Sequence, residues 1–472
     1  MLRFFNTPSR LYEPFAPIVS GSVSLYTCGP TVYDYLHVGN WSSYIRWDIL
    51  VRTLTLSGYN VNRVMNITDV GHLVSDEDEG QDKMVKSSLK HKKNAWELAK
   101  LYTNDFMQGM EKLHLVQPQH ITRATDFINE QLSFICGLKE KGYTYQIDDG
   151  IYFDTAKFPK YANFARLDLE HLKDGARITP NPQKRNPSDF ALWKFSSSNE
   201  HRDMEWDTPS DILDGSPKKG FPGWHLECSA MILSKLGTTI DIHTGGIDHI
   251  PVHHTNEIAQ SESLTGKPLA HYWLHNNFLL VNATKISKSL GNSILLNEIE
   301  KKNIDLMAFK LFILQSHYQT ESNFTWENLT AANHRLVNWV SVLDRKWQVK
   351  NSAMTDSKVS VALASALEAL QQDLDTPRAI IHVEEALHYI ETRGLDASPA
   401  DIAEVELFIQ NGLGIYTMTK DINTSQKTIL KDRENARRNK KWEISDNLRD
   451  ILKNQKILIK DTEDGQIWSR VQ

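Results

Sequence analysis

The sequence contains very little cysteine and no long apolar run. Its three cysteines, Cys28, Cys136 and Cys228, are an odd and sparse set, which argues against a disulfide framework and predicts reduced thiols. No segment approaches the roughly 18 apolar residues that a membrane helix needs. The N-terminal MLRFFNTPSRLYEPFAP also lacks the apolar core of a signal peptide. We therefore expect a cytoplasmic protein that does not bind membranes.

An excess of one charge is absent as well. The formal net charge is −6, from 53 Lys and Arg against 59 Asp and Glu. Any surface for nucleic acid must therefore be a local patch on an acidic molecule. Hydrophobic content of 40% and charged content of 24% are those of an ordinary globular protein. At 472 residues one hydrophobic core is not enough, which predicts about two to four domains.

Strand and helix patterns alternate near the N-terminus. SVSLYT at 22–27 is strand-like, residues 41–58 repeat apolar side chains at helical spacing, and a second strand follows at 60–68. This order favours a parallel α/β sheet. A helix leading into a strand returns in MILSKLGTTIDIHTGG at 231–246. We expect the two halves of the α/β domain at 1–115 and 206–275.

Between these halves lies a region rich in Pro, Asn and Lys. YTYQIDDGIYFDT at 143–155 predicts a hairpin that turns at Asp149 and Gly150. We expect an inserted subdomain at 116–205. From Ile294 the pattern is almost wholly helical, which predicts a connector at 276–345 and an all-α domain at 346–472.

Histidines gather in one stretch, DIHTGGIDHIPVHHTNEIAQSE, which begins at Asp241. Pro251 suits the first turn of a helix. On that helix Glu257 lies four residues after His253 and three after His254, so either pair can bind a metal. Such pairs are also common on hydrogen-bonded surface helices, and the residues alone leave both interpretations open.

Two distant cysteines bear on this choice. Cys28 follows a predicted strand, at the end where α/β proteins bind ligands, and Cys228 lies in PGWHLECSAM at a predicted helix start. Two thiolates, one imidazole and one carboxylate can form a tetrahedral zinc site. Ligands far apart in the sequence leave no regular pattern, so spacing does not decide the matter.

Several motifs together carry a resemblance to a known family. LHVGN at 36–40 resembles the HIGH motif of class I aminoacyl-tRNA synthetases, and KISKS at 285–289 is similar to their KMSKS loop. YTCGPTVYDY precedes the first motif, and PGWHLECSAM and PVHHTNEIAQS lie between the two. In this order and separation the motifs resemble the cysteinyl-tRNA synthetase family over nearly the whole chain.

The resemblance implies a Rossmann-type catalytic domain with an insertion and an all-α anticodon-binding domain. It implies ligation of L-cysteine to tRNA(Cys) through a cysteinyl-adenylate, with ATP, Mg²⁺ and zinc, and we expect a monomer. A zinc ion that takes the substrate thiolate as a ligand would separate cysteine from serine. The implied zinc ligands are Cys28, Cys228, His253 and Glu257.

The resemblance also implies residues for ATP and for the amino acid. His37, Gly39 and Asn40 would lie at the phosphates, and Asp248 would reach the ribose. The residues implied in catalysis are His37, Asn40 and the two loop lysines, Lys285 and Lys288. The implied amino-acid pocket consists of Cys28, Thr68, Trp224 and His225.

The chain departs from the family pattern in places. Asn40 replaces the second histidine of HIGH, although an amide can still donate to phosphate. The glycine-rich triplet before Asp248 is GGI, and HYQ at 317–319 lacks an expected arginine. Near the C-terminus several cations surround Trp442, which suits either RNA contact or an ordinary solvated helix: Arg433, Arg437, Arg438, Lys440 and Lys441.

Three other functions fit part of the sequence. A related ligase that passes cysteine to a sugar amine would keep the zinc site but lack the long helical C-terminal part. An inactive tRNA-binding paralogue is suggested by Asn40 and the missing arginine. A zinc hydrolase built on His253 and Glu257 would need an open metal position with a water. ATP binding would separate these functions.

Overall fold

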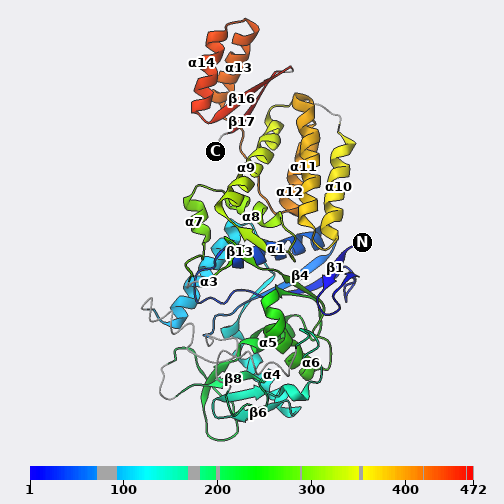
Figure 1. Ribbon diagram of the computed structural model, residues 1–472, viewed down its shortest axis with the longest axis vertical. Coiled ribbons are helices and arrows are strands. Elements are labelled where there is room, and N and C mark those ends of the chain that lie inside the picture. Colours follow the sequence, from blue (N-terminus) through cyan, green and yellow to red (C-terminus); the bar gives the residue numbers. More distant parts are fainter. Residues whose placement is uncertain are drawn as a thin grey trace.

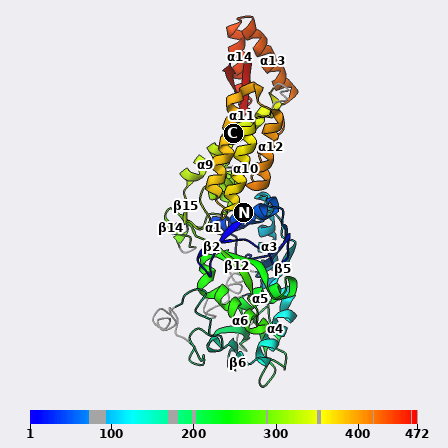
Figure 2. The same ribbon diagram turned by 90° about the vertical axis from the view of Figure 1, so that its right-hand side faces the viewer.

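The computed structural model describes residues 1–71, 93–167, 181–197, 202–287, 290–349, 355–417, 419–463 and 465–470. The molecule is elongated, with α/β parts at one end, a helical bundle in the middle and a small unit at the far end (Figures 1 and 2). In the described part of the chain, no helix has both the length and the apolar character needed to cross a membrane.

A five-stranded parallel sheet lies at the centre of the α/β part. Its strand order is β12 (Ala270–Asn276), β11 (Ile240–Gly246), β3 (Ser22–Thr27), β4 (Asn60–Ile67) and β5 (His120–Arg123). Leu25 packs in one hydrophobic cluster and Tyr26 in another, and both are fully buried. The sheet is therefore covered on both faces, as parallel sheets require.

Strands β3 and β11 are parallel neighbours, but the connections that follow them lead to opposite sides of the sheet. From β3 the chain passes through α1 (Val38–Leu56) to β4, whereas from β11 it passes through α6 (Thr255–Thr265) to β12 on the other side. The predicted strand, helix and strand near the N-terminus are confirmed. A reversal of this kind opens a crevice at the carboxyl ends of the strands, where open α/β sheets bind ligands.

A second sheet, wholly antiparallel, lies at the end of the molecule opposite the small C-terminal unit (Figure 1). Its order is β6 (Thr144–Ile147), β7 (Gly150–Phe153), β8 (Phe190–Phe195), β10 (Lys219–Pro222) and β9 (Trp206–Asp207). This sheet continues to Pro222, beyond the expected end of the insertion at 205. Further helices pack around the two sheets together with α1: α3 (Ala95–Lys112), α4 (Ile128–Glu140) and α5 (Trp224–Lys235).

The hairpin at 143–155 is present, but its predicted turn was one residue late. Ile147 pairs with Gly150, so the two-residue loop is Asp148 and Asp149, and Gly150 opens the second strand. Glycine is needed there for another reason. A Cβ at residue 150 would lie 2.4 Å from the carbonyl oxygen of Trp193 on the neighbouring strand.

The connector joins this part to the helices. It contains a three-stranded sheet of β13 (Leu279–Val281), β14 (Thr284–Lys285) and β15 (Ser322–Phe324), and the helices α7 (Leu296–Lys301) and α8 (Leu306–Leu314). Its chain also bonds to the start of α1, because Val38 N donates to Ile294 O at 2.8 Å. A small N-terminal hairpin, β1 (Arg3–Asn6) and β2 (Leu11–Pro14), packs beside β12.

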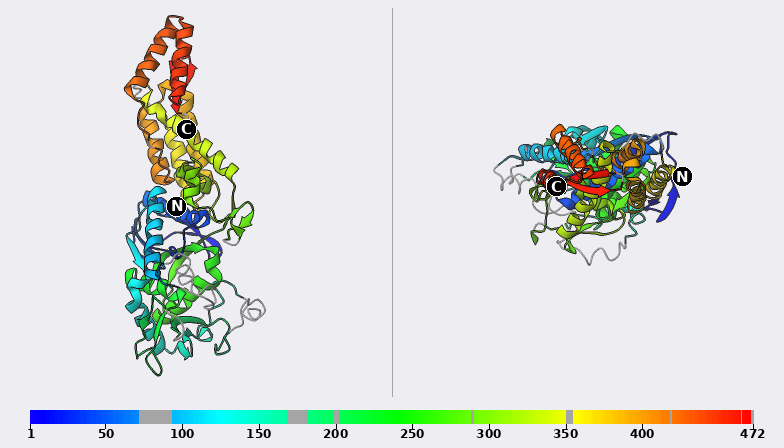
Figure 3. Two further views of the ribbon diagram at one scale, coloured as in Figure 1. Left: turned by 90° about the vertical axis from the view of Figure 1, so that its left-hand side faces the viewer. Right: turned by 90° about the horizontal axis from the view of Figure 1, so that it is seen from above.

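The C-terminal half is largely helical, as predicted. Four helices form a bundle: α9 (Trp326–Leu343), α10 (Ser357–Gln371), α11 (Thr376–Arg393) and α12 (Pro399–Gly412). Beyond it, α13 (Thr424–Arg438) and α14 (Trp442–Asn454) stand at the tip (Figure 3). The tip also contains an antiparallel hairpin, β16 (Ile457–Thr462) and β17 (Gly465–Arg470), which the all-α expectation did not include.

A buried group of charges joins the bundle to α1. The carboxylate of Asp48 on α1 accepts from Lys310 Nζ of α8 at 2.8 Å and from Arg52 Nε at 2.7 Å. Arg52 also donates to the carbonyl oxygen of Gln410 in α12 at 2.9 Å. Burial lowers the pKa of Lys310 to about 8 although Asp48 opposes the shift. Because a buried charge is costly without its partner, these contacts fix α1, α8 and α12 together.

Candidate functional site

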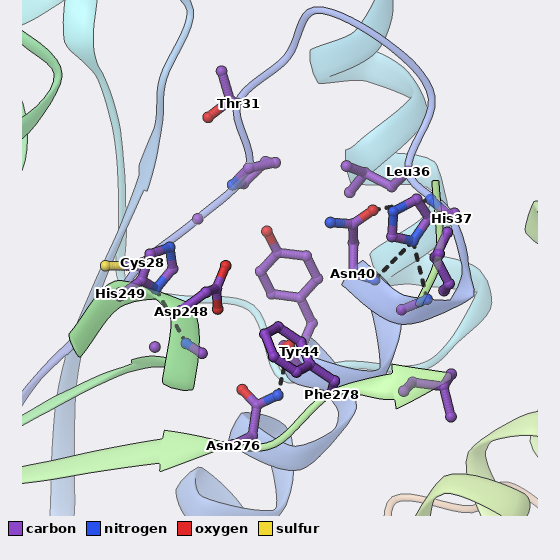
Figure 4. A pocket seen from close by; sticks show the side chains of 18 of the residues that line it. Cys28, Thr31, Leu36, His37, Asn40, Tyr44, Asp248, His249, Asn276 and Phe278 are labelled. Carbon is purple, nitrogen blue, oxygen red and sulfur yellow. Dashed lines mark hydrogen bonds between the residues drawn. The ribbon is translucent and has the colours of Figure 1, made fainter. Parts of the chain in front are cut away.

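A cavity of about 380 Å³ opens where β3, β11 and β12 end, above the N-terminus of α1 (Figure 4). It therefore occupies the crevice between β3 and β11, where the strand order of the sheet reverses. Seven residues predicted from the sequence line its wall: Cys28, His37, Gly39, Asn40, Trp224, Asp248 and Lys285.

The first turn of α1 is closed by a reciprocal cap. His37 precedes the helix, and its Nδ1 accepts from Gly39 N at 3.1 Å and from Asn40 N at 3.3 Å. Asn40 Oδ1 in turn accepts from His37 N at 3.1 Å. This bond orients the Asn40 amide, whose nitrogen points away from His37 into the cavity (Figure 4). A helix N-terminus with a donor amide beside it suits an anionic ligand.

The connector covers this turn. A Cβ on Gly39 would lie 2.8 Å from Cδ1 of Ile286, so the Ile286 side chain packs directly over this glycine. Lys285 ends β14 and lines the cavity, with Nζ 4.6 Å from the centre of the Phe278 ring. Lys288, the second predicted lysine, lies outside the described residues.

Asp248 lies on the opposite wall, in the short turn Ile247–His249 that follows β11. A Cβ on Gly246 would lie 2.3 Å from Asp248 Oδ1, so this glycine is needed for the carboxylate to fold back over the chain. Ile247, which interrupts the glycine triplet, is not among the residues of the wall. The residue that departs from the glycine triplet therefore does not itself contact this cavity.

Four side chains that can bind a metal meet beside the cavity. Cys28, Cys228, His253 and Glu257 each bring one ligand atom within 4.8 Å of the others. The loop after β3 provides Cys28 and α5 provides Cys228. The π-helical turn Ile250–His254 and α6 provide the other two. Glu257 is fully buried, so the surface-helix interpretation is wrong. Two thiols, an imidazole and a carboxylate match the donors that zinc prefers.

Charge is balanced within this group. Glu257 Oε1 lies 3.0 Å from His253 Nε2, and Oε2 lies 2.7 Å from His243 Nε2. Burial alone would raise the pKa of Glu257, but these two imidazoles outweigh it and lower that pKa. Burial lowers the pKa of His253, but Glu257 and Cys228 together outweigh that effect and raise the pKa to about 10.

The two thiols favour the protonated form. A hydrogen bond with Cys28, followed by burial, raises the pKa of Cys228 well above its usual value. The hydrogen bond with Cys228 lowers the pKa of Cys28, but burial and the nearby carboxylates raise it overall. A metal bound here would displace these protons, since it is the thiolate that binds.

Further histidines support this group from behind. His254 Nε2 lies 3.4 Å from Cys28 Sγ, and its Nδ1 is 2.7 Å from His275 Nε2. His275 Nδ1 is in turn 2.7 Å from Thr7 Oγ1. His275 and Thr7 were not predicted, because they lie far from the histidine-rich stretch in the sequence. Partners of this kind orient metal ligands.

Two residues expected in the amino-acid pocket do not line the cavity. His225 is 1% exposed, and its Nδ1 lies 3.0 Å from Nδ1 of His253, so it supports a metal-ligating ring. Thr68 is 3% exposed and donates from Oγ1 to Glu227 Oε2 at 3.0 Å. Both lie behind the wall that Cys28 and Trp224 form.

The basic cluster near the C-terminus is partly engaged within the protein. The Arg433 side chain is fully buried and pairs with Asp461 of the C-terminal hairpin at 2.8 Å, so it is structural. Arg437 contacts the same carboxylate at 2.9 Å. Its guanidinium carbon also lies 5.8 Å from the ring of Trp442, which is 56% exposed. Trp442 and its neighbours thus remain the accessible part of the cluster.

Comparison with known proteins is consistent with this geometry. The family model "tRNA synthetases class I (C) catalytic domain" matches residues 14–334. The chain is 38% identical to the cysteine–tRNA ligase of Treponema denticola over 502 residues, covering 100% of both. It is 40% identical to cysteine–tRNA ligase 1 of Burkholderia lata, covering 98% of this chain and 96% of that protein.

The fold also has solved relatives. Mycobacterium tuberculosis methionyl-tRNA synthetase in complex with methionyl-adenylate superposes with a TM-score of 0.58 at 15% identity. The match covers 83% of this chain and 92% of that one. At this identity the likeness concerns the fold alone.

Proposed function

Because the chain belongs to the cysteinyl-tRNA synthetase family of class I aminoacyl-tRNA synthetases, we propose that it joins L-cysteine to tRNA(Cys) through a cysteinyl-adenylate, with zinc as the group that recognises the thiol. In this proposal the enzyme is a monomeric, cytoplasmic cysteine–tRNA ligase. Its parallel-sheet part is the catalytic domain, and its helices beyond residue 346 bind the anticodon region.

One observation carries the proposal. Cys28 belongs both to the four side chains that can hold a metal and to the wall of the cavity above α1. A metal held by these side chains and phosphates bound at the start of α1 would therefore face one space. Formation of cysteinyl-adenylate needs this proximity, because the carboxylate of cysteine must reach the α-phosphate of ATP.

The N-terminus of α1 would stabilise the phosphates. During adenylate formation negative charge moves toward the leaving pyrophosphate, and donors already in place lower the barrier. Asn40 would donate its amide protons and Lys285 would add a positive charge from the connector. Lys288 is proposed for the same role by its place in the motif. Mg²⁺ bound with ATP would neutralise part of the phosphate charge. Asp248 would accept from the ribose.

Selection against serine requires more than the shape of the cavity. Serine and cysteine differ by one atom, and a pocket of fixed shape separates such ligands by about 1–3 kcal/mol. Four orders of magnitude require roughly 5.5 kcal/mol. Zinc held by Cys28, Cys228, His253 and Glu257 would supply the difference, because it prefers a thiolate to a hydroxyl. Trp224, whose ring centre is 4.9 Å from that of His253, would exclude water from this place.

Binding of tRNA is proposed for the elongated helical half. The bundle and the tip extend away from the cavity, as a partner that touches both ends of the molecule would require (Figure 1). The exposed Trp442 suits stacking on an unpaired base, and nearby cations suit phosphate contact. A ligase that transfers cysteine to a sugar amine would not need α9 to α14.

Asn40 does not favour the inactive alternative. The asparagine keeps the cap of α1 and still presents a donor to the cavity. A hydrolase would instead need its metal open to a water and a general base. Such an enzyme would have no need for a phosphate-binding helix start beside its metal, which this cavity has at α1.

The test is cysteine-dependent exchange of pyrophosphate into ATP, followed by charging of tRNA(Cys). Exchange with cysteine, at least a thousandfold weaker exchange with serine, and about one zinc per chain are expected. Exchange that serine supports equally well would contradict thiol recognition by the metal. Absence of exchange with both amino acids would contradict the proposed activity altogether.

A further inference from the structure

The two thiols come from a loop and a helix, which are not paired with each other as neighbouring strands would be. Cys28 lies in the loop after β3, and Cys228 lies in α5, which packs over the sheet. Nevertheless their sulfur atoms lie within 4.8 Å of each other. A metal requires this distance to be kept to within a few tenths of an ångström. Some contact must therefore hold the loop against the helix.

A chain of three hydrogen bonds makes this contact. Gly29 N, next to Cys28, donates to Asn66 Oδ1 at 2.7 Å. Asn66 Nδ2 donates to Thr68 Oγ1 at 3.2 Å, and Thr68 Oγ1 donates to Glu227 Oε2 at 3.0 Å. Glu227 immediately precedes Cys228 in α5. The chain thus begins beside one thiol and ends beside the other.

The direction of every bond in this chain is determined. The Gly29 amide can only donate, so Asn66 must turn its oxygen toward it and its NH₂ group toward Thr68. Thr68 Oγ1 then accepts from Asn66 Nδ2 and donates its single proton to Glu227 Oε2. Asn66, Thr68 and Glu227 are 2%, 3% and 0% exposed, so water does not compete for these groups.

The loop is also pressed close to β4. A Cβ on Gly29 would lie 1.7 Å from the carbonyl oxygen of Asn66, so only glycine allows this approach. Thr68 N donates to Pro30 O at 2.9 Å, and Val32 N donates to Thr68 O at 3.0 Å. The backbone thus fixes the loop to the end of β4, and the side chains of Asn66 and Thr68 extend that attachment to α5.

We propose that Asn66, Thr68 and Glu227 are positioning residues for the metal centre, and that their hydrogen bonds set the separation of the Cys28 and Cys228 thiols. The inference rests on the metal site proposed above. It assigns to Thr68 a different role from contact with the amino acid, because its hydroxyl is used within the wall. Outer partners of metal ligands commonly affect metal affinity by about 10- to 100-fold.

Thr68→Val tests this role, with Thr68→Ser as its matched control. Valine has nearly the size of threonine but neither accepts nor donates, whereas serine keeps the hydroxyl. Zinc affinity is measured by competition with a chromophoric chelator, in the absence of cysteine, ATP and tRNA. Thr68→Val should bind zinc about tenfold more weakly, and Thr68→Ser should stay within about threefold of the wild type.

Cobalt supplies a readout that a general loss of stability would not change. Co²⁺ in the wild type and in Thr68→Ser should give the same visible absorption bands, which depend on the geometry of the thiolate ligands. In folded Thr68→Val the bands should shift or weaken. Unchanged zinc affinity and unchanged cobalt bands in Thr68→Val would overturn the proposal.

A second variant, Asn66→Asp, keeps the proposal testable if Thr68→Val does not fold. It is nearly isosteric, but it places a carboxylate on each side of the single Thr68 proton, so the chain is broken and the same tenfold loss is expected. Failure of both variants to fold, judged by circular dichroism, would also count against a positioning role. A wild type that binds no zinc would instead refute the metal site of the proposed function.

Discussion

Asn40→Asp should separate the two roles of the first turn of α1. The aspartate carboxylate has almost the same shape as the asparagine amide that it replaces. One of its oxygens can still accept from His37 N, a bond that is 3.1 Å long in the structure. The other oxygen would replace the amide nitrogen that points into the cavity (Figure 4). The cap is kept while a donor becomes a negative charge.

The two expected effects have opposite signs. An acidic residue in the first turn of a helix stabilises it by about 0.3–1 kcal/mol, so the thermal midpoint should stay level or rise. Two negative charges about 4 Å apart repel by roughly 4 kcal/mol at an effective dielectric constant of 20. This energy corresponds to about a thousandfold loss in kcat/KM for ATP.

The assay is cysteine-dependent pyrophosphate exchange over a range of ATP concentrations, combined with thermal unfolding. Asn328→Asp is the matched control, because Asn328 is also the third residue of its helix, α9, but is exposed and does not line the cavity. The control should leave exchange unchanged. If Asn40→Asp keeps the ATP dependence of the wild type within a few-fold, the amide does not face the phosphates and the reasoning fails.

Three further predictions concern the metal and the core. Cys228→Ser should lose zinc and cysteine-dependent exchange together, as followed by metal analysis and the exchange assay; retained zinc with full preference for cysteine over serine would contradict the site. Lys310→Met leaves the Asp48 carboxylate without its buried ammonium and should cost about 3–5 kcal/mol in urea unfolding, and a loss below about 1 kcal/mol would argue against a buried pair. Burial raises the pKa of Asp69 to about 6 from 3.8, so between these pH values the folded state binds more protons than the unfolded state. The free energy of unfolding should therefore fall by up to about 3 kcal/mol as pH rises from about 4 to about 6. Asp69→Asn should flatten this part of the stability profile measured by urea unfolding, and an unaltered slope would show that Asp69 does not titrate there.

Local patterns were sufficient for the parallel sheet and its helices. The strand at 22–27 and the helix after it were identified from their residue patterns. The burial of α1 did not follow from those patterns, because residues 44–54 are all buried and the helix has no exposed side there. The turn of the hairpin at 143–155 was misplaced because Gly150 was taken as a turn residue. Its glycine is required by contact with Trp193, a residue 43 positions away that no local pattern reveals.

The C-terminal hairpin carried a signal that was missed. In the structure Ile457 and Ile459 are buried while Leu458 and Lys460 are exposed, although the three apolar residues at 457–459 show no alternation in the sequence itself. The signal in the sequence is the Asp-Gly pair of DTEDGQ, which is typical of a hairpin turn. Arg433 was misjudged for the same reason, since its partner Asp461 belongs to this hairpin.

The candidate metal site depended on the resemblance more than on spacing. Its ligands are spread from Cys28 to Glu257, and only the fold brings them together. The contacts that support the metal ligands are even harder to predict from the sequence. His275, Thr7 and Glu227 are ordinary residues of strands, turns and helices in the sequence, and their importance follows from hydrogen bonds between distant segments.

The charges around Asp48 also limit how the enzyme can open and close. Lys310 ties α8 to α1, and Arg52 ties α12 to the same carboxylate, so a swing of the whole connector would pull buried ions apart. A shift of α8 or α12 relative to α1 would have to break one of these buried contacts, so the three helices should move as one unit and keep the helical arm in a fixed relation to the parallel sheet.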